Sequence, residues 1–180
     1  MQKRFLTAAT ALSLVIPAAL AGGAEGQQPV GPVTTAQVSN DTDVLFMEVA
    51  SMSNLTEITT SQLALQKSTN QTVRAFAQQM ITEHTRAQNE LRALAQAKGV
   101  RIADKPGADQ RLQYNRLTTL SGAAFDAAYK NVQVNGHQMT LDLIETYRPL
   151  SKDQQVGAYA AKIQPAVARH LEEAKALPGG

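Results

Sequence analysis

The chain contains three histidines, and each lies where helical periodicity predicts a buried apolar residue. The apolar stripe around His84 consists of Val73, Ala77, Met80, Ala87, Leu91 and Leu94. His137 and His170 occupy similar positions in two other segments, and Glu57 does so in a fourth. A bundle of these helices would bury one imidazole or carboxylate from each of them. Such groups need a protein partner, a metal ion or a water molecule, because unpaired burial is costly.

The chemistry that this set could support is the binding of one transition metal ion. Glu57, His84, His137 and His170 would supply one carboxylate and three imidazoles, a suitable ligand set for Zn, Mn, Fe or Cu. Glu57, His84 and His137 each lie about 12 to 15 residues from the nearest predicted turn, so we expect them at about the same height along the bundle. His170 lies about 19 residues from its turn, which predicts a position roughly a turn and a half too far. Pro165, inside the same predicted helix, could bend or shift it.

Two other interpretations of the histidines bear on function. A diiron site needs Glu-x-x-His motifs, but Ile81, Val134 and Val167 stand three residues before the histidines, so a ferroxidase centre is disfavoured. Alternatively, each histidine is a structural core residue, bonded to a carbonyl, to a hydroxyl such as that of Thr140, or to a carboxylate such as that of Glu57 or Glu173. The sequence carries no nucleophile elbow, phosphate loop or catalytic triad order, which favours a non-catalytic protein.

The elements that must position these residues are four amphipathic helices. We expect them over residues 42–67, 70–99, 109–148 and 151–177, the third with a break at Ser121-Gly122. Predicted N-caps are Asp41 or Thr42 for the first and Asn70 for the second, and Ser151 with Gln154 forms a capping box for the fourth. Residues 70–77 and 153–160 share the order polar cap, valine, Ala-aromatic-Ala. This indicates either a duplicated hairpin or the general likeness of alanine-rich helices. Both origins predict an all-α antiparallel four-helix bundle built from two hairpins, over residues 41–178.

The residues before the bundle predict export. Lys3 and Arg4, an apolar run to Leu20 and a small-x-small site ending at Ala21 are typical of a signal peptide over residues 1–21. Residues 22–40 are rich in Gly, Pro, Gln and Thr and predict a disordered linker. The chain has no cysteine, so its fold depends on packing without disulfides. We expect a protein of the periplasm or cell envelope.

Charge narrows the possible partners. Without the two basic residues of the signal peptide, the chain has 15 basic and 15 acidic residues. This balance argues against nucleic-acid binding and against polybasic membrane attachment. We expect no stable membrane insertion after signal cleavage and a monomer or weak homo-oligomer, and an unidentified protein partner stays open.

Several segments resemble a known family. These are Glu57 with Leu63-Ala64, residues 73–80 with Glu83-His84, residues 120–129 with His137, and His170-Leu171. Together they resemble an exported bacterial group, domain-of-unknown-function family 4142, over about residues 43–177. The resemblance implies a ferritin-like four-helix fold and a periplasmic or envelope setting, and it supplies no established activity. Gly136 departs from the family, which more often has an acid before this histidine.

These observations lead to one preferred function and two alternatives. The preferred interpretation is an exported, stress- or envelope-associated bundle that is non-catalytic and holds one metal ion. The alternatives are a metal-dependent redox or metal-storage protein, and a protein-interaction scaffold whose core histidines are structural.

Overall fold

The computed structural model describes residues 34–179, and this part of the chain is entirely helical with no strand. Its long helices are α1 (Thr42–Lys67), α2 (Gln71–Ala97), α4 (Gly122–Tyr147) and α5 (Gln154–Lys175), with a shorter α3 (Ala108–Thr118) and two 3-10 turns, η1 (Thr35–Val38) and η2 (Arg148–Leu150). The predicted signal peptide and residues 22–33 of the predicted linker lie outside the described residues.

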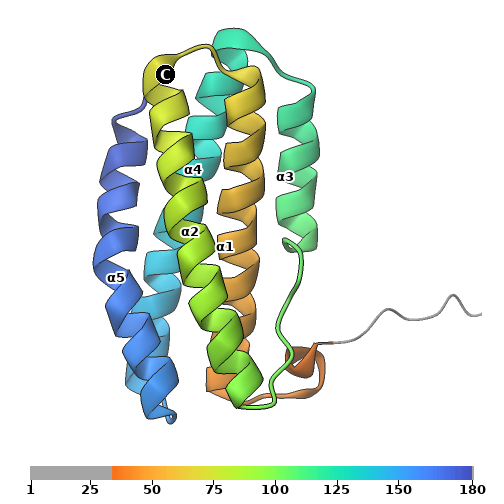
Figure 1. The fold of residues 1–180 in the computed structure, drawn as a ribbon, viewed down its shortest axis with the longest axis vertical. Helices are drawn as coiled ribbons and strands as arrows, with labels where there is room; N and C mark the ends of the chain where they lie inside the picture. The colour runs from red at the N-terminus through yellow and green to blue at the C-terminus, as the bar shows by residue number, and fades with distance from the viewer. Residues whose placement is uncertain (1–33, 180) are drawn as a thin grey trace, which may run out of the picture. The chain divides into compact units, whose positions relative to one another are not determined.

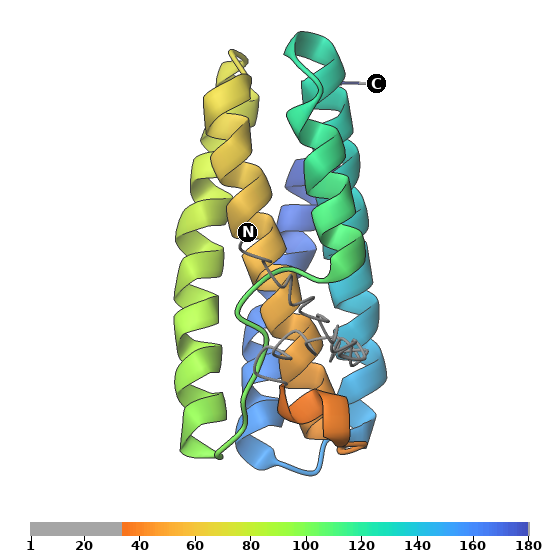
Figure 2. The same cartoon turned by 90° about the vertical axis from the view of Figure 1, so that its right-hand side faces the viewer.

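The four long helices form the predicted antiparallel bundle. α1 and α2 make one hairpin, α4 and α5 make the other, and α1 packs against α4 (Figures 1 and 2). The loop after α2 leads to α3, which packs against α1 and α4 at the side of the bundle. The prediction of an all-α bundle built from two hairpins is therefore confirmed.

Side-chain caps fix where the long helices begin. Asp41 accepts hydrogen bonds from the N–H groups of Asp43 and Val44 at the start of α1, and Asn70 does the same for α2, both as predicted. The capping box predicted at Ser151 is wrong, because Asp153 caps α5. The Ser151 hydroxyl is instead hydrogen-bonded to Tyr147, which belongs to the end of α4.

The described part of the predicted linker also differs from expectation. Residues 35–38 form η1, and the backbone N–H of Thr35 donates to the carbonyl of Arg101 at 2.9 Å. This segment is therefore attached to the loop between α2 and α3.

A buried polar layer divides the core into two apolar clusters. One cluster contains Phe46, Met47, Leu91, Ile144 and Tyr147, and the other contains Leu63, Met80, Leu117, Phe125 and Tyr129. Between them along the four long helices lie the buried residues Asn54, Glu57, Thr60, His84, Gln88, Gln133, His137 and His170. A bundle of this size does not need such a layer for stability, because burying polar groups contributes less than burying apolar ones. The layer is thus a candidate functional site.

The buried face of α2 departs slightly from the predicted stripe. After His84 it continues through Gln88, Leu91 and Ala95, whereas Ala87 and Leu94 are half-buried. The apolar face is rotated by one residue at this point, and the rotation brings Gln88 into the core.

Leu91 tests the packing of the first cluster. Its side chain is fully buried, so Leu91→Ala is expected to lower the free energy of unfolding by about 2 to 5 kcal/mol. Ile163→Ala should cost less, because Ile163 is only half-buried and lines a pocket. Urea unfolding of the two variants measures both values, and equal losses would contradict the assigned core.

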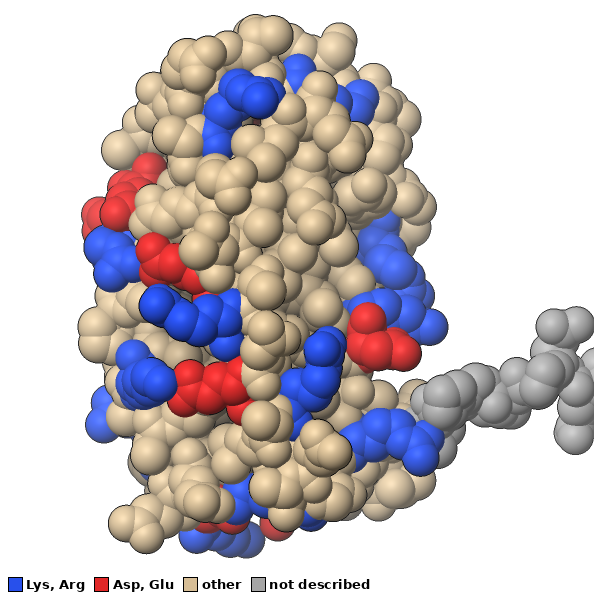
Figure 3. Space-filling view, in the orientation of Figure 1, with Lys and Arg blue, Asp and Glu red and all other residues tan. Residues whose placement is uncertain are grey.

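Among the described residues, no helix combines the length and apolarity needed to cross a bilayer. Lysine, arginine, aspartate and glutamate are interspersed on the face shown in Figure 3.

Candidate metal centre

The three histidines meet in the middle of the bundle. His84 comes from α2, His137 from α4 and His170 from α5, and their ring centroids are 5.4 to 5.5 Å apart in every pair. One ligand nitrogen from each ring can be chosen so that all three lie within 4.8 Å of one another. All three side chains are buried. The rings therefore form a triangle around one point.

The predicted height of His170 is wrong, since this residue lies level with the other two. The prediction placed the start of the last helix at Ser151, but α5 begins at Gln154. In addition, the chain continues beyond α4 through η2 before it turns. Both features reduce the difference in height between His137 and His170.

Each ring uses one nitrogen in a hydrogen bond to oxygen. His84 Nδ1 lies 2.9 Å from Asn54 Oδ1, and His137 Nδ1 lies 2.8 Å from the carbonyl oxygen of Gln133. His170 Nε2 lies 3.0 Å from Glu83 Oε2, which also accepts from Arg169 at 2.7 Å. Because these oxygens accept, each imidazole donates its N–H to them. Arg169 Nη2 also lies 3.1 Å from His170 Nε2, but it is a donor like the imidazole N–H and makes its shorter hydrogen bond to Glu83.

The other nitrogen of each ring has no partner. His84 Nε2, His137 Nε2 and His170 Nδ1 are buried without a hydrogen bond in the described part of the chain. With the N–H placed on the opposite nitrogen, each of these atoms carries a lone pair. Metal-bound histidines characteristically donate their second nitrogen in this way, which fixes the tautomer and the ring orientation.

Burial keeps the imidazoles neutral. It lowers the pKa of His84 well below the ordinary value, an effect that the neighbouring histidines increase. It lowers the pKa of His137 to about 4, and it lowers that of His170 against the opposing effect of Glu83. A neutral imidazole is the form that binds a metal ion.

A hydrogen-bond chain holds the orientation of His84. The amide of Asn54 accepts from His84 and donates to Gln88 Oε1 at 3.2 Å. Gln88 in turn donates to Ser51 Oγ at 2.7 Å, and Ser51 donates to the carbonyl of Ala103 at 2.7 Å. Every group in this chain has a fixed donor or acceptor role, so the chain determines which nitrogen of His84 carries the proton.

Glu57 lies beside His137 but outside the group of three histidines. Its Oε1 is 3.9 Å from His137 Nδ1, the nitrogen already bonded to Gln133, and Glu57 is not part of the three-histidine group. Burial raises the pKa of Glu57 to about 8, while the side chain of Gln133 opposes the shift. A Cβ at Gly136 would lie 2.6 Å from Glu57 Oε1, so the absence of a side chain there makes room for this carboxyl.

The sequence reasoning did not identify the partners of the histidines. Asn54 and Gln88 were missed, and the acid bonded to His170 is Glu83 from α2 rather than Glu173. A signal was present, because Gln88 and Gln133 each stand one helical turn from a histidine on the same face. Met80, from the apolar stripe around His84, belongs to the second apolar cluster.

Comparison with protein families matches residues 28–177 to the family described as Domain of unknown function (DUF4142). The chain belongs to this family. The match covers all five helices and the three histidines. Comparison with curated proteins found no match.

Solved structures with a similar fold include several of a protein called CopM. Its Cu(I)-bound form has a TM-score of 0.63 at 18% identity, covering 74% of this chain and 92% of that one. Its Ag-bound form obtained by soaking has a TM-score of 0.60 at 17% identity, covering 74% and 91%. Its apo form has a TM-score of 0.60 at 17% identity, covering 74% and 93%. The likeness establishes a shared helical fold for this DUF4142 protein.

Proposed function

We propose that this protein binds one copper ion between His84, His137 and His170 and serves in the cell envelope to hold copper rather than to catalyse a reaction. One observation carries the proposal. Three buried imidazoles meet, and each has one hydrogen-bonded nitrogen and one nitrogen without a partner among the described residues. Purely structural histidines do not need three unsatisfied nitrogens in one place, since each such atom costs stability.

The ligand set favours copper over the other metals considered. Imidazoles suit Cu, Zn, Ni and Fe, whereas Mn prefers oxygen ligands, and no carboxylate joins the three histidines among the described residues. Divalent copper binds nitrogen sites more tightly than the other first-row divalent ions. Three neutral ligands also favour a monovalent ion, because the buried net charge is then smaller. The fold shared with the copper- and silver-bound forms of CopM supports the same choice.

Copper binding can be measured with very little background. The chain has only these three histidines and no cysteine, so no other imidazole or thiol can bind the ion. Titration of untagged protein against a chromogenic Cu(I) chelator should give one copper per chain. His84→Ala should weaken the affinity at least a hundredfold, because it removes one of three ligands.

Two controls make the titration decisive. Leu91→Ala lowers stability without touching the site, so it should keep full copper affinity and separate unfolding from ligand loss. Asn54→Leu leaves all three ligands but removes the acceptor of His84, and it should weaken binding about 10- to 100-fold. Equal Cu(I) affinity of wild type and His84→Ala would overturn the proposal and place the metal elsewhere, for example on the methionines.

A further inference from the structure

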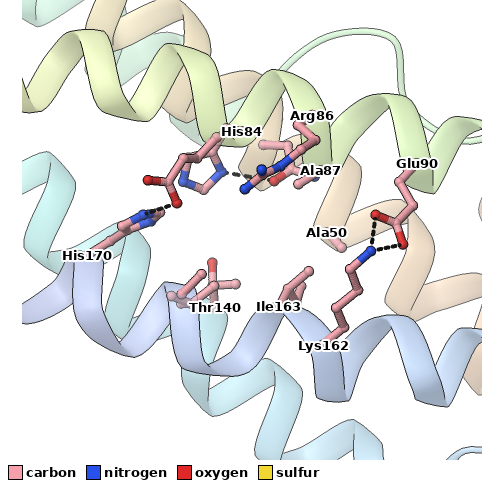
Figure 4. A pocket seen from close by; sticks show the side chains of 13 residues that line it. Ala50, His84, Arg86, Ala87, Glu90, Thr140, Lys162, Ile163 and His170 are labelled. Carbon is pink, nitrogen blue, oxygen red and sulfur yellow. Dashed lines mark hydrogen bonds and ion pairs between the residues drawn. The ribbon is translucent and has the colours of Figure 1, made fainter.

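A pocket connects the histidines with the surface. It lies between α2 and α5 and has a volume of about 310 Å³. His84 and His170 line one part of it, and Lys162 and Glu90 from the two helices form an ion pair at 2.8 Å in another part (Figure 4). Its remaining walls are largely apolar and include Ala87, Ile163, Ala166 and Val167. At about 30 Å³ per water molecule, it has room for roughly ten non-hydrogen atoms.

The charged groups of the pocket leave one positive charge without a partner. Glu83 is paired with Arg169, and Glu90 is paired with Lys162. Arg86 also lines the pocket and has no hydrogen-bond or ion-pair partner in the described part of the chain. The lining as a whole carries two acidic and two basic side chains, so it has no net charge until a cation binds at the three neutral histidines. A bound cation would make the site positive, and together with the apolar walls this favours an anion with an apolar body.

The oxidation state of copper determines whether such an anion is needed. Three imidazoles are sufficient for a monovalent ion of low coordination number, but divalent copper takes a further nitrogen or oxygen ligand. No side chain besides the three histidines joins the group of ligand atoms in the described residues. The pocket reaches two of the three histidines and is therefore the place from which a further ligand can come.

We infer that this pocket binds a small organic monocarboxylate, which ligates copper in its divalent state. The inference rests on the proposed copper site. The carboxylate supplies an oxygen ligand and a negative charge, its apolar body contacts Ala87 and Ala166, and Arg86 contributes attraction. The Cu(I) protein does not need this ligand, so the carboxylate should favour the divalent form.

Benzoate is a suitable probe, because it has nine non-hydrogen atoms and one carboxylate. Benzyl alcohol is its neutral counterpart of similar size. Copper is first loaded as Cu(II) and quantified, so that failure to load the wild type counts against the copper site itself. Titration with benzoate should then change the visible and electron paramagnetic resonance spectra of the bound Cu(II), whereas benzyl alcohol should leave them unchanged. Benzoate should bind the Cu(I) protein at least tenfold more weakly, measured by calorimetry.

Pocket variants with matched controls locate the binding. Ala166→Phe fills the pocket from α5, and it should weaken benzoate binding at least tenfold while copper stays bound. Ala161→Phe makes the same change at an exposed position outside the pocket and should have no effect. Ala87→Phe fills the pocket from α2 and should reproduce the result if Ala166→Phe does not fold. Arg86→Gln should weaken benzoate binding several-fold. Arg92→Gln should have no effect, because Arg92 lies outside the pocket.

Two results would overturn the pocket assignment while leaving the copper site intact. One is Cu(II)-loaded wild type whose spectra do not respond to benzoate. The other is a response that persists undiminished in both Ala166→Phe and Ala87→Phe, which would place the carboxylate outside this pocket.

Discussion

His137→Leu is expected to stabilise the metal-free protein by about 1 to 2 kcal/mol and to abolish its stabilisation by copper. The substitution removes a buried nitrogen that has no partner, and such a group costs about 1 to 3 kcal/mol. The hydrogen bond lost with Nδ1 is inexpensive, because the carbonyl of Gln133 belongs to the same helix, one turn earlier, and is not left without a donor. Leucine fills a similar volume with apolar atoms between the two apolar clusters.

Copper should reverse the order of stability of wild type and His137→Leu. A ligand present at a thousand times its Kd stabilises the folded state by about 4 kcal/mol, so wild type with copper should exceed His137→Leu in unfolding free energy. Urea unfolding with a chelator and with buffered Cu(I) measures all four states. His170→Leu serves as a second case, in which Glu83 keeps its ion pair with Arg169.

The opposite result would support the structural interpretation. If the histidines only complete the core, His137→Leu should lose stability through imperfect packing, and copper should change neither protein. That outcome would leave the bundle as an interaction scaffold, the alternative that the sequence left open.

Helical periodicity was sufficient to predict that the three histidines are buried, but it could not predict the arrangement of their atoms. His84, His137 and His170 stand at core positions of three predicted helices, and burial of all three follows from this spacing alone. Helix caps such as Asp41 and Asn70 were also predictable, since their local geometry depends on neighbouring residues only.

The remaining features depend on contacts between helices. The level of His170 is determined by η2 and by the Asp153 cap, and a shift of two or three residues in a turn moves a side chain by several ångströms. The partners of His84 come from another helix and a loop, because Asn54 is on α1 and Ala103 follows α2. No spacing within one helix predicts a chain of hydrogen bonds across several elements.

Glu57 illustrates the same limit. The stripe on α1 predicts that this carboxyl is buried, and it is. Its position beside Nδ1 of His137 rather than beside the unpartnered nitrogens depends on how far α1 and α4 are rotated toward each other. Whether Glu57 contributes to metal binding therefore stays a prediction, and Glu57→Gln in the copper titration tests it.

The metal-free protein is expected to lose about 2 to 4 kcal/mol of stability as the pH falls from 6.5 to 5. An unfolded histidine has a pKa near 6.5 and takes up a proton in this range, whereas the folded imidazoles resist protonation because burial lowers their pKa values. The unfolded state then binds more protons, so stability falls with pH until the folded pKa is reached, about 4 for His137.

Glu57 acts in the opposite direction over the same range. Its folded pKa of about 8 lies above the unfolded value, so its contribution to stability is complete at low pH and is lost as the pH rises through 8. The single carboxyl of Glu57 therefore reduces the loss of stability that the three imidazoles cause between pH 6.5 and 5, but it does not reverse that loss. Glu57→Gln should therefore steepen the decline between pH 6.5 and 5.

Urea unfolding of chelator-treated protein at several pH values measures this dependence, and the double variant His84→Leu, His137→Leu supplies the control. With two of its three titrating imidazoles removed, that variant should be nearly insensitive to pH between 6.5 and 5. An equally steep decline in both proteins would assign the acid sensitivity to other groups. A steep decline in wild type alone would show that the folded state disfavours protonated imidazoles, and copper held by them should then be released over the same pH range, because protons compete with the metal for the same nitrogens.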